Sequence, residues 1–150
     1  MARVPRSALP EYGYFHVYAR AVAAAGLLFV DDDDRQSFIQ LLWHTARLHD
    51  WTCHVFCLMG THYHAVVETR RESLSSGLHR LNFLYATRFN DRHGRFGHVF
   101  SERFSTRVIE SEEYLFDACT YVLLNPIRAG LCDRTEEWPW SYSRYGHDLA

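Results

Sequence analysis

The segment LMGTHYHAVVE, Leu58–Glu68, decides the fold because a turn and most of a strand lie within it. Met-Gly-Thr is a short turn between two runs rich in β-branched and aromatic residues, so Trp51–Leu58 and His62–Thr69 are predicted to pair as a hairpin. Side chains alternate between the two faces of a strand, and same-face Cα atoms are ~6.6 Å apart. His62 and His64 are therefore expected to share one face.

Two imidazoles that converge from one face of a strand suit a divalent metal ion. The chain has ten histidines in 150 residues, so an accidental His-x-His spacing fits as well. The spacing alone leaves both interpretations open. The other histidines have no comparable spacing and are interpreted as packing or surface residues: His16, His44, His49, His54, His79, His93, His98 and His147.

Composition predicts one domain over residues 1–150, since a chain of this length that is 47% hydrophobic can bury a sizeable core. No run approaches the ~20 apolar residues of a membrane span, and the first residues lack the apolar stretch of a secretion signal. We expect no membrane association and a cytoplasmic location. The four cysteines form no CxxC pair, which favours buried free thiols in a reducing compartment.

The charge of the chain is unevenly distributed. All sixteen basic residues are arginines, and the net charge is −2. Residues 70–107 nevertheless carry a balance of +5, against −7 for the rest of the chain. Such a cluster is often only a solvated helix face. Because arginine is suited to forked contacts with phosphate, the middle of the chain is also a candidate nucleic-acid surface.

The remaining periodicity predicts two strands and two helices around the hairpin. A strand is expected at Tyr12–Ala19, followed by a helix that Asp31–Asp34 begins and that runs to about His49. A second helix is expected at Leu74–Asp91, and a strand within Gly97–Ile109.

A third helix should begin at Ser111 and end near Asn125, which precedes a proline. At ~100° per residue, Tyr121 and Asn125 lie ~40° apart and off the apolar stripe of this helix. They could face a site on the sheet together, or be a half-buried aromatic and a helix-ending amide. The element order predicts an α+β, ferredoxin-like split βαβ fold. Its four-stranded antiparallel sheet would have helices on one face, plus a C-terminal helix that carries the tyrosine.

Two motifs together resemble a known family. His62–Tyr63–His64 is followed, some sixty residues on, by YVLLNPIRAG at residues 121–130, and the pair is similar to the REP-associated tyrosine transposases. These belong to the single-tyrosine HUH transposases of bacteria, the insertion-sequence-200-like group. The segments FHVYARA, LFVDDDDRQSFIQLL, GHVFSERF and WPWSYSRY also have counterparts in order, so the resemblance covers nearly the whole chain.

The resemblance implies a DNA transposase or endonuclease that acts near palindromic hairpins in the bacterial cytoplasm, at the nucleoid. His62, His64 and Asn125 would bind Mg²⁺ or Mn²⁺, and Tyr121 would attack a phosphate of single-stranded or hairpin DNA to form a 5′-phosphotyrosine. A monomer and a homodimer are both consistent with the family. The arginines expected to contact DNA are Arg80, Arg88, Arg92, Arg95, Arg103, Arg107 and Arg128.

The chain departs from the family pattern at two places. Gly60–Thr61 stands where relatives usually have Pro-Asn, and Ser101–Glu102 occupies a segment in which many have Gln. These departures leave weakened activity or an altered choice of DNA open. Two alternative functions also remain. One is a non-catalytic nucleic-acid-binding domain of the same fold, and the other is a metal-dependent phosphodiesterase that uses water in place of the tyrosine.

Overall fold

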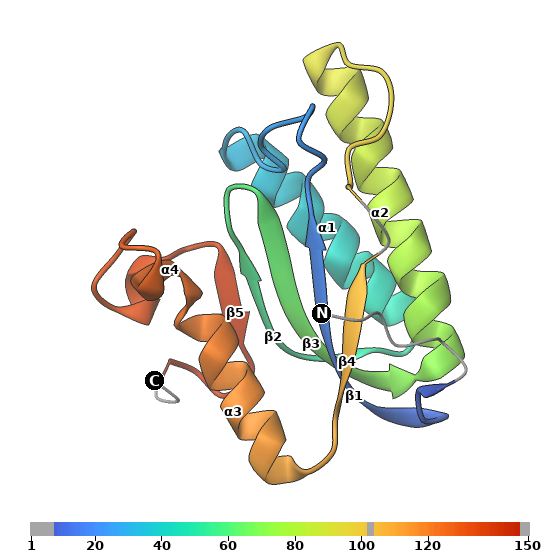
Figure 1. The fold of residues 1–150 in the computed structure, drawn as a ribbon, viewed down its shortest axis with the longest axis vertical. Coiled ribbons are helices and arrows are strands. Elements are labelled where there is room, and N and C mark those ends of the chain that lie inside the picture. The colour runs from blue at the N-terminus through green and yellow to red at the C-terminus, as the bar shows by residue number, and fades with distance from the viewer. Residues whose placement is uncertain (1–7, 102–103, 148–150) are drawn as a thin grey trace.

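The computed structural model describes residues 8–101 and 104–147. The predicted order of elements is confirmed, and Figure 1 shows how they are arranged. Along the chain they are β1 (Tyr12–Arg20), α1 (Asp32–Leu48), β2 (Thr52–Leu58), β3 (His62–Arg70), α2 (Arg71–His93), β4 (Ser105–Ile109), α3 (Glu112–Leu123), α4 (Asn125–Arg128), a 3₁₀ turn (Thr135–Glu137) and β5 (Ser141–Ser143).

The sheet is antiparallel, with the strand order β4-β1-β3-β2-β5. The prediction of four strands is wrong, because the tail adds β5 to the edge of β2, where Phe56 is opposite Tyr142. An uncovered strand edge exposes unpaired backbone groups, and β5 covers part of the β2 edge. The three inner strands, β1, β3 and β2, are each paired on both sides.

The two faces of the sheet have separate cores. On one face, α1 and α2 cover Phe15, Val17 and the same-face residues of β2 and β3. On the opposite face, α3 packs Cys119 and Val122 against Val55 of β2 (Figure 1). The expected layers are confirmed: the two early helices lie on one side of the sheet, and the helix with the tyrosine lies on the other.

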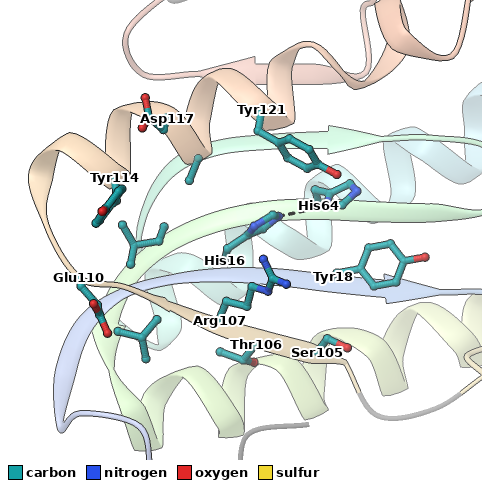
Figure 2. Close-up of a pocket in the computed structure, with 13 residues that line it drawn as sticks. His16, Tyr18, His64, Ser105, Thr106, Arg107, Glu110, Tyr114, Asp117 and Tyr121 are labelled. Atoms are coloured by element: carbon teal, nitrogen blue, oxygen red, sulfur yellow. Dashed lines mark hydrogen bonds between the residues drawn. The ribbon is translucent and has the colours of Figure 1, made fainter. Parts of the chain in front are cut away.

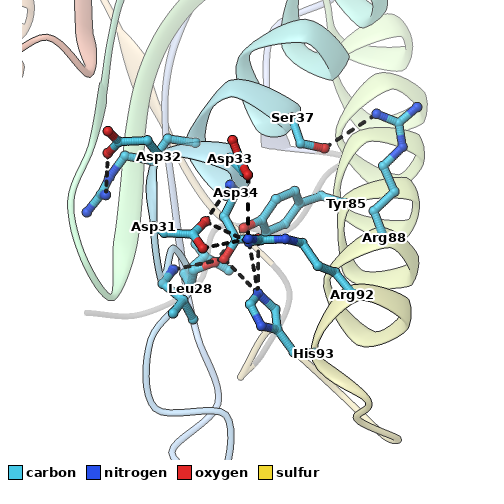
Figure 3. A network of polar contacts seen from close by, with 12 residues as sticks. Leu28, Asp31, Asp32, Asp33, Asp34, Ser37, Tyr85, Arg88, Arg92 and His93 are labelled. Carbon is cyan, nitrogen blue, oxygen red and sulfur yellow. Dashed lines mark hydrogen bonds and ion pairs between the residues drawn. The ribbon is translucent and has the colours of Figure 1, made fainter.

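A polar network joins the start of α1 to the end of α2 (Figure 3). Asp31 is the N-cap of α1 and accepts a hydrogen bond from the Asp34 backbone N–H, as the acidic run predicted. Arg92 of α2 donates to Asp31 at 2.6 Å and to the buried Asp34 at 2.8 Å, and His93 pairs with Asp34 at 2.9 Å. The network therefore holds the two helices of this layer together.

Helix α2 is longer than predicted, because it begins at Arg71 directly after β3. It runs to His93, two residues beyond the predicted end at Asp91, and is followed by Gly94, whose φ of 62° is left-handed. In the middle of α2, Gly77 lies against the buried indole of Trp51.

The chain after Ser111 also follows the predicted pattern. The Ser111 side chain caps α3, and Asn125 lies just past its end, where it begins α4. All four cysteines are free thiols, and Cys53, Cys57 and Cys119 are buried. Within residues 8–101 and 104–147, no helix has the length and apolarity to cross a membrane.

Candidate functional site

The two histidines of the hairpin lie on the sheet face that α3 covers, at the start of β3. Their ring centroids are 5.2 Å apart. The neighbouring strand β1 brings Tyr18 opposite His64 in the register, and the Tyr18 ring is 5.4 Å from that of His62 and 5.0 Å from that of His64. Side chains of β1 and β3 therefore form one cluster of aromatic and imidazole rings.

His64 is oriented by His16 of β1. His16 Nε2 lies 3.0 Å from His64 Nδ1, and the two rings are 5.2 Å apart. Burial, the nearby charges of His16 and His62, and Arg128 lower the pKa of His64 to about 3, while burial and Arg107 lower that of His16 to about 4. Both rings are neutral at pH 7. When His64 donates from Nδ1 to His16, its Nε2 lone pair is available for a ligand.

His62 has an equivalent partner in Thr61. The Thr61 hydroxyl lies 3.0 Å from His62 Nδ1, so Nε2 is the nitrogen without a hydrogen bond among the described residues. Burial lowers the pKa of His62 as well. The turn that carries Thr61 is itself held by backbone hydrogen bonds, because Gly60 O accepts from Leu28 N at 2.9 Å and Thr61 O accepts from Ala21 N at 2.8 Å. The Gly-Thr sequence therefore orients His62.

Tyr121 reaches the histidines from α3 within the same chain. Its ring is 6.0 Å from the rings of both His16 and His64, and 49% of the residue is exposed. Arg128 lies over the Tyr121 ring, with its guanidinium carbon 4.2 Å from the ring centroid, and donates to the Tyr121 carbonyl at 2.6 Å. The guanidinium thus holds the segment after α3 against the aromatic ring.

Asn125 lies one turn beyond Tyr121. Its amide N–H donates to Val122 O at 3.4 Å, so its Oδ1 has lone pairs that could bind a cation. Imidazole nitrogens and an amide oxygen are donor types that suit Mn²⁺ or Mg²⁺ when phosphate or water oxygens complete the shell. Among the described residues, however, no hydrogen bond joins Asn125 to His62 or His64, and its side chain is bonded to Val122 instead. No three His, Cys, Asp or Glu side chains among the described residues form a metal-binding group. A metal site here depends on the amide and on oxygens from a ligand.

A cleft of about 860 Å³ opens between α3 and the β4 edge of the sheet (Figure 2). His16, His64 and Tyr18 lie on its floor, Tyr121 lies on its α3 wall, and Arg107 projects into it from β4. Its volume is within the range of ~300–1,000 Å³ that is typical of ligand sites. A ligand in the cleft could therefore contact His16, His64 and Tyr121 together, whereas His62 and Asn125 are not among the lining residues.

The predicted DNA-binding arginines fall into two groups. Arg107 and Arg128 lie beside the cleft and Tyr121, while the arginines of α2 and its end lie on the other layer of the fold.

On that layer Arg92 is ion-paired with Asp31 and Asp34, which gives it a structural role. The others there bind locally or are buried: Arg88 donates to Ser37, Arg95 donates to Asn90 and to His98 O, and Arg80 Nη1 is buried without a hydrogen-bond partner among the described residues. Arg103 lies outside the described residues, and the role of all seven in DNA binding stays a prediction.

The interpretation of His16 as a packing or surface residue missed its contact with His64. The sequence contains a signal for it, since Tyr14, His16 and Tyr18 alternate along one face of β1. This alternation predicts a contact with the histidine pair only once the register of β1 against β3 is known, in which Tyr18 is opposite His64.

The fold is similar to that of a REP-associated tyrosine transposase that was solved bound to a REP hairpin. The TM-score is 0.71, the alignment covers 94% of this chain and 82% of that chain, and 15% of the aligned residues are identical. No protein-family model and no curated protein matches the chain. Likeness at this identity establishes a transposase-like fold, so the resemblance that the two motifs indicated is confirmed at the level of the fold.

Proposed function

We propose that this chain is a metal-dependent transposase that cleaves and rejoins single-stranded DNA near palindromic hairpins. The observation that carries the proposal is the position of Tyr121, whose ring lies 6.0 Å from that of His64 in the same chain. A nucleophile and a phosphate-activating site can then act together without a second subunit, which supports a monomer. The similar solved structure contains a REP hairpin, which supports this class of DNA as the partner.

Tyr121 would be the nucleophile. Its phenol oxygen attacks the scissile phosphorus and forms a P–O bond, while the bond from phosphorus to the 3′-oxygen breaks. The proton of the phenol is released to solvent, which reaches this half-exposed side chain. The product is a 5′-phosphotyrosine and a free 3′-end. Because the energy of the broken bond is kept in the covalent link, a second 3′-OH can reverse the step without a nucleotide cofactor.

The other residues bind and orient the phosphate. His62, His64 and Asn125 would hold Mg²⁺ or Mn²⁺, which supplies a Lewis acid for the charge that develops on the phosphate. His16 and Thr61 keep the outward nitrogens of the two histidines aimed at that position. Arg107, which projects into the cleft from β4, is suited to a forked contact with a flanking phosphate.

The test uses a pool of DNA hairpins with randomised single-stranded flanks, labelled at the 3′-end, with the protein and Mn²⁺. We expect a labelled covalent protein–DNA adduct on denaturing gels, which is absent with Tyr121→Phe, with His62→Ala and with EDTA. Tyr114→Phe is the matched control, since Tyr114 is an exposed tyrosine two turns earlier on the same helix and lines the opposite end of the cleft from Tyr121 (Figure 2).

Two outcomes would replace the proposal by its alternatives. Hairpin binding that is unchanged in His62→Ala, with no adduct from any protein, would indicate a non-catalytic binding domain. Cleavage that survives in Tyr121→Phe would indicate a phosphodiesterase that uses water. Either result would overturn the role of Tyr121 as the nucleophile.

A further inference from the structure

A second tyrosine lies closer to the histidine pair than Tyr121 does. The Tyr18 ring is 5.4 Å from that of His62 and 5.0 Å from that of His64, whereas the Tyr121 ring is 6.0 Å from that of His64. The two phenols contact the His64 ring from different elements, Tyr18 from strand β1 and Tyr121 from helix α3. Figure 2 shows both hydroxyls directed toward the same end of the cleft, with His64 between them.

Tyr18 is held in place by the sheet. Its strand is paired on both sides, with Tyr18 opposite His64 on β3 and opposite Ser105 on β4. Its hydroxyl has no hydrogen-bond partner within residues 8–101 and 104–147, although the ring is partly buried and lines the cleft. A rigidly placed O–H donor that points into a cleft without a partner is ready to bind an oxygen of a ligand.

We propose that Tyr18 donates a hydrogen bond to the departing 3′-oxygen during cleavage, an inference that rests on the function proposed above. In an in-line displacement the attacking and departing oxygens lie on opposite sides of phosphorus. Tyr121 supplies the attacking oxygen from α3, so the departing oxygen faces the strand side of the cleft, where Tyr18 lies.

The atoms of this step balance without a further reactant. As the Tyr121 oxygen bonds to phosphorus, the 3′-oxygen leaves with the electron pair of its bond and later takes a proton from solvent. Tyr18 keeps its own proton and stabilises the charge on the departing oxygen. In the reverse reaction, the same hydrogen bond positions the incoming 3′-hydroxyl.

The position of cleavage is first mapped with the wild-type protein. A second oligonucleotide is then made in which sulfur replaces the bridging 3′-oxygen at that position. Sulfur is a weak hydrogen-bond acceptor, so loss of a donor to the departing atom affects the oxygen substrate only. Adduct formation is followed under single-turnover conditions in Mn²⁺ for the wild type, for Tyr18→Phe and for Tyr14→Phe. Tyr14 is the matched control, because it lies on the same face of β1 against His54, away from the histidine pair.

We expect Tyr18→Phe to slow adduct formation on the oxygen substrate about 10²-fold, the lower end of the loss caused by removing one donor from an oxyanion site. We expect no slowing on the sulfur substrate, and no effect of Tyr14→Phe on either. Equal slowing of both substrates would show that Tyr18 only supports the packing of the histidines, and unchanged rates on both would show that it has no role. If the wild type forms no adduct with either DNA, the proposed function itself fails, which is a distinct result.

Discussion

Gly77 in the middle of α2 offers a sharp test of the packing. A Cβ at this position would lie 2.4 Å from Cζ2 and 2.8 Å from Cε2 of Trp51, where carbon atoms prefer about 3.5–4.0 Å. The indole cannot shift without cost, because it is buried and its Nε1 donates to Ser73 O at 3.0 Å. Gly77→Ala should therefore destabilise the protein, although alanine is the better helix former.

The magnitude follows from three opposing effects. Overpacking a close-packed site costs about 1–3 kcal/mol, and displacing the indole N–H from Ser73 adds about 1 kcal/mol. Replacing a helical glycine by alanine returns about 1 kcal/mol of helix propensity. The net loss for Gly77→Ala is about 2 kcal/mol, which corresponds to a fall in Tm of roughly 4–8 °C for a chain of this size.

Urea unfolding followed by circular dichroism measures this difference. Ser76→Ala is the control, because Ser76 is exposed on the same helix and should gain stability or stay neutral. In a Trp51→Leu background the ring atoms are gone, so Gly77→Ala should become neutral or stabilising. A loss of the same size in both backgrounds would refute the contact with Trp51 as its cause.

Two further predictions concern the histidines and the network between α1 and α2. His16→Phe and Thr61→Val should each weaken Mn²⁺ binding about 10–100-fold in calorimetric titrations, because each removes the hydrogen-bond partner of one imidazole. Unchanged affinity would contradict the role of His16 and Thr61 in orienting His64 and His62. Hydrogen bonds from Arg92 and from the Asp34 backbone lower the pKa of Asp31 from 3.8 to about 2. The ionised Asp31 carboxylate therefore stabilises the folded state above pH 3.8, and this contribution is lost as the pH falls through about 2. The free energy of unfolding should therefore fall more steeply between pH 4 and pH 2 in the wild type than in Asp31→Asn, a variant that keeps an N-cap side chain. Parallel pH profiles of the two proteins would exclude a stabilising contribution from the Asp31 charge.

The elements that could be predicted from the sequence have local signals. The turn before His62, the capping run at Asp31 and the glycine after α2 each act within a few residues of the boundary that they set. The strand β5 could not be predicted, because Ser141–Ser143 has no periodicity and pairs only where the β2 edge is available. Its existence depends on a contact about ninety residues away along the chain.

In the candidate site, too, features with a local sequence signal could be predicted, whereas contacts between distant segments could not. The pair on β3 and the tyrosine on α3 were identified from spacing and from the motif resemblance. The contact of His16 with His64 depends on strand register, and the pairing of Arg92 with Asp31 depends on how α1 and α2 pack. Arg128 was expected to contact DNA from the motif resemblance, and that role stays a prediction; its position over the Tyr121 ring follows from the turn at α4. A cluster of arginines along the sequence therefore does not predict which surface of the fold each arginine faces.

The two imidazoles of the hairpin are oriented by partners of different origin. His64 is paired with His16 across strands, while His62 is paired with its own neighbour, Thr61. In both contacts Nδ1 is the bonded nitrogen, so Gly60–Thr61, which departs from the family pattern, still places a hydrogen-bonding side chain beside the first histidine. Added Cβ atoms at Gly60 would meet only Leu27 Cδ2 at 3.6 Å, an ordinary contact, so the glycine itself is not required by space. The Gly60–Thr61 turn therefore contacts His62 through the Thr61 hydroxyl, and its glycine leaves the backbone without a steric conflict.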